Sequence, residues 1–161
     1  MSQALADLGA VRDVAKTFSD APTVKNGRAG SWIVRGDHMV PGQRARGRVR
    51  IKNGGRRTGV LYVRPRRALD TPGPGGAPLS TRLLLAIRRI DRRGGLHTVW
   101  KGYLSEMGKV RVGVLRPGAV RRYRFVVLFR VRPPARGSFR DNAFQDSRFA
   151  TDFVWQLVPL R

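Results

Sequence analysis

The chain has 161 residues, and a domain of this size buries roughly 70% of its unfolded surface, so one self-sufficient core is expected. Its 41% hydrophobic and 27% charged residues exclude wholesale disorder, and the absence of cysteine excludes disulfides, thiolate metal sites and cysteine nucleophiles. A net charge of +23, from 33 basic and 10 acidic residues, predicts attraction to polyanions, although a compositional bias of the source genome would produce the same excess.

The N-terminal segment carries the only stretch with helical spacing, Leu5 to Ala15, where Leu5, Leu8 and Val11 recur on one face. Residues 1–13 lack the basic start and apolar run of a secretory signal, so an exported form would need a signal outside this sequence. No apolar run approaches the ~20 residues of a membrane span, and we therefore expect no membrane-spanning segment.

Strand-like alternation begins after this segment. A first strand is expected at Ser31 to Arg35, around Trp32, and a second at Arg44 to Lys52. In the second, small and apolar residues occupy one face and five cations the other: Ala45, Gly47, Val49 and Ile51 against Arg44, Arg46, Arg48, Arg50 and Lys52. This pattern predicts one buried face and one solvent-exposed face.

Shorter strands are expected in the middle of the chain, each bounded by turn residues such as Asn53-Gly54-Gly55 or Pro117-Gly118. Their ranges are Gly59 to Arg64, Leu83 to Ile90, Thr98 to Leu104 and Lys109 to Val114. The Pro- and Gly-rich stretch from Asp70 to Pro78 is interpreted as a loop within one domain, because similar strands lie on both sides.

Two strong strands follow. In the first, Tyr123, Phe125, Val127, Phe129 and Val131 alternate with arginines such as Arg122 and Arg124, and apolar residues on its outer side indicate a central strand. The second runs from Phe149 to Leu157 and is rich in aromatics. The whole pattern predicts an all-β, single-domain, jelly-roll-like antiparallel β-sandwich of about eight strands over residues 19–161, preceded by an N-terminal arm, residues 1–18.

Catalytic motifs are absent from the sequence. The two histidines, His38 and His97, are far apart and lack the His-Glu-x-x-His pattern of a zinc site. No Gly-x-Ser-x-Gly elbow, Walker loop or dinucleotide fingerprint is present. We therefore expect no enzymatic activity, no metal site and no cofactor.

The order of these features resembles the TasA/camelysin family of secreted bacterial matrix proteins. The resemblance rests on Val40-Pro41-Gly42, on Trp100 to Leu104, on Leu115 to Gly118 with the strand after it, and on Asp141 to Asp146 before the last strand. It implies a jelly-roll-like sandwich that is secreted to the extracellular matrix or cell surface and self-associates into fibres. It also implies that Ala4 to Phe18 is a donor strand, with Val11, Val14 and Phe18 as its assembly residues, although a disordered or self-packed arm is the alternative.

The arginine-bearing strand faces are candidate polyanion-binding surfaces, with extracellular DNA or acidic polysaccharide as partners. The residues are Arg44, Arg46, Arg48, Arg50, Arg122 and Arg124. A plain solvated exterior is the other interpretation of these faces. Two further functions stay open: a monomeric nucleic-acid- or polyanion-binding module, although the aromatics alternate away from the arginines, and a capsid or appendage subunit.

Overall fold

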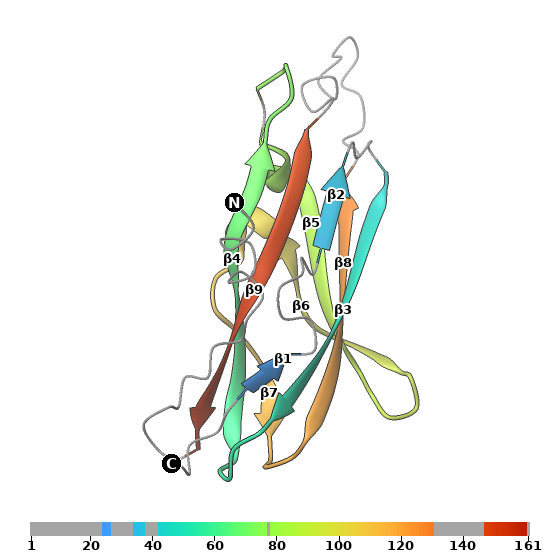
Figure 1. The fold of residues 1–161 in the computed structure, drawn as a ribbon. Coiled ribbons are helices and arrows are strands. Elements are labelled where there is room, and N and C mark those ends of the chain that lie inside the picture. Colours follow the sequence, from blue (N-terminus) through green and yellow to red (C-terminus); the bar gives the residue numbers. More distant parts are fainter. Residues whose placement is uncertain (1–23, 27–33, 38–41, 77, 131–146, 161) are drawn as a thin grey trace.

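The structure is a computed structural model that describes residues 24–26, 34–37, 42–76, 78–130 and 147–160. In these residues the chain forms nine strands in two antiparallel sheets, and the predicted all-β sandwich is confirmed (Figure 1). The strands are β1 Val24–Asn26, β2 Val34–Asp37, β3 Arg44–Asn53, β4 Gly59–Thr71, β5 Leu83–Ile90, β6 Leu96–Tyr103, β7 Val110–Leu115, β8 Val120–Phe129 and β9 Arg148–Pro159. Two short 3-10 turns, Leu79–Thr81 and Leu104–Glu106, are the helical elements among the described residues.

The larger sheet has five strands in the order β1-β3-β8-β5-β6. Its strands β3 and β8 show the alternation that the sequence predicted, since every second residue of β3 from Gly47 to Asn53 is buried and the arginines between them are exposed. β8 lies between β3 and β5, so the expectation of a central strand is also confirmed. These two strands therefore turn arginines outward and most of their apolar residues inward, although Val126 and Leu128 of β8 lie on the outer face opposite Arg46 and Arg44.

The smaller sheet has the order β2-β9-β4-β7. β4 is longer than expected. The sequence indicated a strand that ends at Arg64 and a loop that begins at Asp70, whereas β4 continues through Pro65 to Thr71. β7 accompanies β4 only over residues 59–63, so Pro65 lies where β4 has become an edge strand on that side. A missing N–H is tolerated at such an edge, which explains why the proline does not end the strand.

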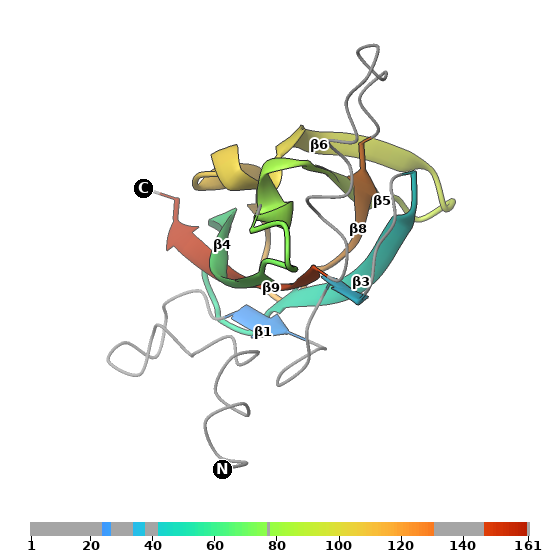
Figure 2. The same cartoon turned by 90° about the horizontal axis from the view of Figure 1, so that it is seen from above.

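The core lies between the sheets and is dominated by aromatic contacts between β8 and β9. The ring centroids of Phe125 and Phe153 are 4.5 Å apart, and those of Tyr123 and Trp155 are 5.2 Å apart. Seen from above, the strands surround this core (Figure 2). Aromatic pairs of this geometry add to the burial of large apolar surfaces, so they contribute to the packing of the two sheets against each other.

Asn53 joins two turns at the base of the sandwich and is completely buried. Its Nδ2 donates to the carbonyl oxygens of Arg57 at 2.8 Å and Leu115 at 3.1 Å, and its Oδ1 accepts from the N–H of Gly55 at 2.9 Å. The sequence indicated only a turn here. The side chain in fact ties the β3–β4 turn to the end of β7.

Several predictions fall on residues that the structure does not describe. These are the helix at Leu5 to Ala15, the N-terminal arm with Val11, Val14 and Phe18, and most of the strand expected at Ser31 to Arg35, of which β2 covers Val34 onward. No helix in the described part of the chain is long and apolar enough to cross a membrane.

Candidate polyanion-binding face

The pairing register places arginines directly opposite one another on the outer face of the five-stranded sheet. Arg48 of β3 lies opposite Arg124 of β8, and Arg124 lies opposite Arg88 of β5 on its other side. One step along the sheet, Arg50 lies opposite Arg122. Because neighbouring strands are about 4.8 Å apart, these side chains rise from one continuous patch.

We call this patch the cationic face: Arg44, Arg46, Arg48, Arg50, Arg88, Arg122 and Arg124. It contains all six residues that the sequence analysis selected and adds Arg88. The arginines of β3 and Arg122 are exposed, whereas Arg124 and Arg88, which lie opposite each other, are half-buried. The sequence analysis missed Arg88 because no alternation marks the end of β5 at Arg88-Arg89-Ile90.

Acidic residues are absent from β3, β5, β6 and β8, the four long strands of this sheet. Like charges directly opposite each other in a sheet are destabilising. Arg88 Nε is buried, and it has no hydrogen-bond partner among the described residues. The cationic face therefore carries electrostatic repulsion that a bound anion would relieve.

A shallow hollow lies in the middle of the cationic face. It has a volume of about 290 Å³ and is lined by Arg46, Gly47, Arg48 and Arg124. A guanidinium group presents several N–H donors in a fixed plane that matches phosphate, sulfate and carboxylate oxygens. The hollow is thus suited to one anionic group of a longer polymer.

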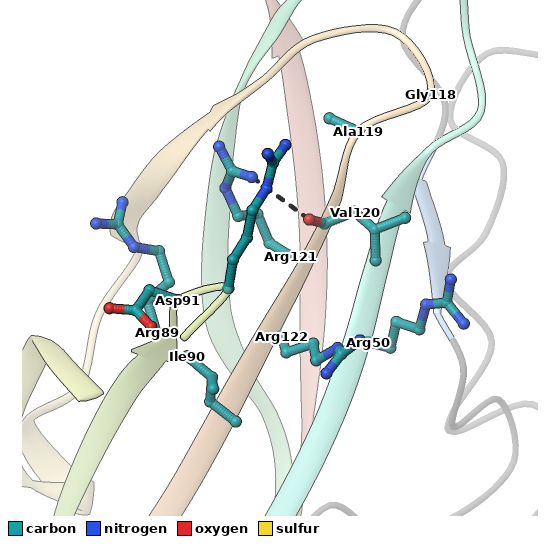
Figure 3. A pocket seen from close by; sticks show the side chains of 10 residues that line it. Arg50, Arg89, Ile90, Asp91, Gly118, Ala119, Val120, Arg121 and Arg122 are labelled. Atoms are coloured by element: carbon teal, nitrogen blue, oxygen red, sulfur yellow. Dashed lines mark hydrogen bonds between the residues drawn. The ribbon is translucent and has the colours of Figure 1, made fainter. Parts of the chain in front are cut away.

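A second, larger hollow lies at the end of the sheet, and we call it the end hollow. Its volume is about 710 Å³, and it is bordered by the end of β5, the β7–β8 turn and the start of β8 (Figure 3). It brings Arg89 and Arg121 together with Arg50 and Arg122 of the cationic face. Sequence reasoning missed Arg89 and Arg121 because they alternate toward the core side, and only the adjacent pairs Arg88-Arg89 and Arg121-Arg122 hinted at them.

No aromatic residue is among the described residues that line the two hollows. Tyr123, Phe125, Phe129, Phe153 and Trp155 are all buried in the core, as their alternation predicted. Stacking of bases requires aromatic rings on the same surface as the cations. The cationic face accordingly has the chemistry for contacts to charged groups, not for reading bases.

Three carboxylates of the described residues, those of Asp70, Asp91 and Asp152, accept hydrogen bonds within the fold. Asp91 bonds to His97, and this hydrogen bond, with those from backbone N–H groups, holds the pKa of Asp91 below its usual value. Asp70 accepts from the N–H groups of Leu79 and Ser80. Asp152 is buried, and burial raises its pKa, a shift opposed by the N–H of Phe153 and by Arg66. No group of three or more His, Asp or Glu suited to a metal occurs in the described ranges.

The fold and its surface define a class: an antiparallel β-sandwich whose larger sheet has a cationic outer face, with no acidic residue in the strands described for that sheet. No protein-family model and no curated protein matches the chain. Among solved structures, the crystal structure of Spo0M, a sporulation control protein from Bacillus subtilis, matches with 14% sequence identity and a TM-score of 0.30. That match covers 86% of this chain and 49% of Spo0M, and at this TM-score it carries no argument about function. The resemblance to the TasA/camelysin family gains no support from these comparisons and stays a prediction.

Proposed function

We propose that this protein is a non-enzymatic β-sandwich that binds polyanions through the cationic face. One observation carries the proposal: the register sets Arg48 beside Arg124 and Arg50 beside Arg122 on a sheet whose long strands contain no acidic residue. Surface arginines are usually interspersed with carboxylates that neutralise them. A patch that lacks such neighbours is best stabilised by anions from a ligand.

The ligand class follows from the geometry of the cationic face. Its arginines occupy consecutive rows across β3 and β8, so an extended polymer can contact several of them at once. No aromatic residue lines the two hollows of this sheet in the described part of the chain, which favours binding to phosphate or sulfate groups without regard to sequence. Extracellular DNA and acidic polysaccharides are therefore the proposed partners, and the proposed place of action is outside the cell.

The test measures binding of the chain to duplex DNA and to heparin over a range of salt concentrations. In one variant, four arginines of the cationic face are changed to glutamine: Arg48, Arg50, Arg122 and Arg124. In the matched control, four exposed arginines of the other sheet and its ends are changed in the same way: Arg64, Arg111, Arg116 and Arg148. Both variants lose four positive charges. A difference in binding between them therefore reports the position of the lost charges, not the change in net charge.

We expect the cationic-face variant to bind duplex DNA roughly 10- to 100-fold more weakly, with a salt slope shallower by up to about 0.9 per lost contact. The control should stay within a few-fold of the unchanged chain. Equal losses in both variants would show that only net charge matters, and binding that does not respond to salt would contradict the proposal. Circular dichroism verifies that both variants are folded.

Self-assembly into fibres by strand addition is a second proposed function, favoured by an observation at the edge of the larger sheet. Within the described residues, β1 pairs only with residues 51–53 of β3, and residues 44–50 have no strand partner on that edge. A strand edge with unpaired N–H and C=O groups accepts an incoming strand. The proposed donor is Ala4 to Phe18 of a neighbouring subunit.

Electron microscopy tests this assembly on the purified full chain at low and high salt. A variant with serine at Val11, Val14 and Phe18 should lose its fibres, whereas serine at the interleaved Arg12, Lys16 and Thr17 should leave them intact. Fibres that persist without the three apolar side chains would refute the donor role. Monomers under every condition would instead favour a monomeric polyanion-binding module.

A further inference from the structure

The end hollow combines arginines from both sides of the central strand β8. Figure 3 shows Arg89 and Arg121 on one side of this strand and Arg50 and Arg122 on the other. The register explains the split, since Arg121 lies opposite the inward-facing Ile51 and Arg122 lies opposite Arg50. With Arg92 of the β5–β6 turn, five arginines line one hollow.

Asp91 is the one carboxylate among the residues that line this hollow, and its single negative charge is outnumbered by the five arginines. Asp91 Oδ1 accepts from the N–H groups of Gly95 at 2.6 Å and Arg93 at 2.9 Å, and its Oδ2 accepts from His97 Nε2 at 3.0 Å. Both oxygens of Asp91 therefore already accept hydrogen bonds within the β5–β6 hairpin. In the described part of the chain, none of the five arginines forms an ion pair with it.

Arg89 and Arg121 are half-buried and keep most of their hydrogen-bonding capacity. Arg121 Nη1 donates one long bond, 3.4 Å, to the carbonyl oxygen of Val120. Both cations lie close enough to Tyr123 to oppose the rise of its pKa, which burial nevertheless raises to about 12. A partly desolvated guanidinium with free donors binds phosphate oxygens more strongly than one in bulk water does.

Size and placement identify the ligand. A volume of about 710 Å³ lies within the roughly 300–1,000 Å³ range of small-molecule sites and is far larger than one phosphate needs. A ligand that reaches Arg89 and Arg121 as well as Arg122 and Arg50 must carry several anionic groups along a short chain. We infer that the end hollow binds a short chain of linked phosphates, either free polyphosphate or the triphosphate of a nucleotide. This site is separate from the binding of polymers on the cationic face, although Arg50 and Arg122 belong to both.

Calorimetric titration at physiological salt tests the inference with three probes: tripolyphosphate, adenosine triphosphate and inorganic phosphate. We expect tripolyphosphate to bind at one site per chain and at least roughly tenfold more tightly than inorganic phosphate. Tighter binding of adenosine triphosphate than of tripolyphosphate would support the site and identify a nucleotide. The reverse order would support the site and identify free polyphosphate.

Two double variants separate this site from the cationic face. Arg89→Gln with Arg121→Gln should weaken tripolyphosphate binding at least roughly tenfold and leave binding of duplex DNA within a few-fold, while Arg48→Gln with Arg124→Gln should do the opposite. If the first pair unfolds the chain, Arg92→Gln in the exposed turn replaces it, with Arg93→Gln beside it as the control.

Equal loss of tripolyphosphate binding in both double variants would overturn the inference, as would binding of inorganic phosphate as tight as that of tripolyphosphate. Because the two double variants share no residue, failure of DNA binding leaves the result for tripolyphosphate interpretable, and the converse also holds.

Discussion

Replacing Arg124 with glutamate should stabilise the protein while it weakens the binding of polyanions. Arg124 lies directly between Arg48 and Arg88 on the outer face of the sheet, so both of its cross-strand neighbours carry the same charge. Glutamate at this position removes two repulsive pairs and creates two attractive ones. At about 0.2–1 kcal/mol for each such pair, we expect the free energy of unfolding to rise by roughly 1–2 kcal/mol.

The measurements are thermal melting at low and high salt and titration with duplex DNA. The midpoint of melting should rise by roughly 2–6 °C at low salt, and the gain should shrink in high salt because these side chains are partly exposed. Arg124→Gln is the control, with an intermediate stability, since it removes repulsion without adding attraction. A glutamate variant that melts lower than the glutamine variant would show that the arginines do not repel one another.

Asn53→Ala is expected to destabilise the fold more than any change to a surface charge. The substitution removes two bonds donated by Nδ2 and one accepted by Oδ1, and it leaves the buried carbonyl oxygen of Leu115 without this partner. A buried group left without its hydrogen bond costs about 1–3 kcal/mol, and the lost turn contacts add to this. We expect the free energy of unfolding to fall by roughly 2–4 kcal/mol.

Unfolding in urea, followed by far-UV circular dichroism, measures this loss. Thr81→Ala is the matched control, because Thr81 also donates a side-chain hydrogen bond to a backbone oxygen, that of Pro78 at 2.8 Å, but does so while exposed. Its loss should stay within about 0.5 kcal/mol. Similar losses of unfolding free energy in the two variants would mean that the buried hydrogen bonds of Asn53 contribute no more to stability than an exposed one.

The alternating strands could be predicted from the sequence because their evidence is local. A side chain in a strand points to the face opposite its neighbour, so the pattern of β3 and β8 separates inward-facing residues from outward-facing ones without knowledge of any partner. In β9 the same period fails from Phe149 to Phe153, where every residue is buried. The same period assigned three aromatic residues to the core: Tyr123, Phe125 and Trp155. It assigned six arginines to the outer surface: Arg44, Arg46, Arg48, Arg50, Arg122 and Arg124.

The sites depend on pairing between distant segments, which no local pattern contains. Only the tertiary structure sets β3 against β8, and a register shifted by one residue would have turned one strand's arginines inward. The sequence around Asn53 predicts only a turn. The tertiary structure brings Leu115, 62 positions away, to the Asn53 side chain, which donates a buried hydrogen bond to its carbonyl oxygen. The alternation alone predicts that Arg89 and Arg121 face the core. In the structure they lie at the end of the sandwich and line a hollow. The sequence by itself thus determined which residues of β3 and β8 alternate between the core and the outer face, and the pairing of distant strands decided which charges meet.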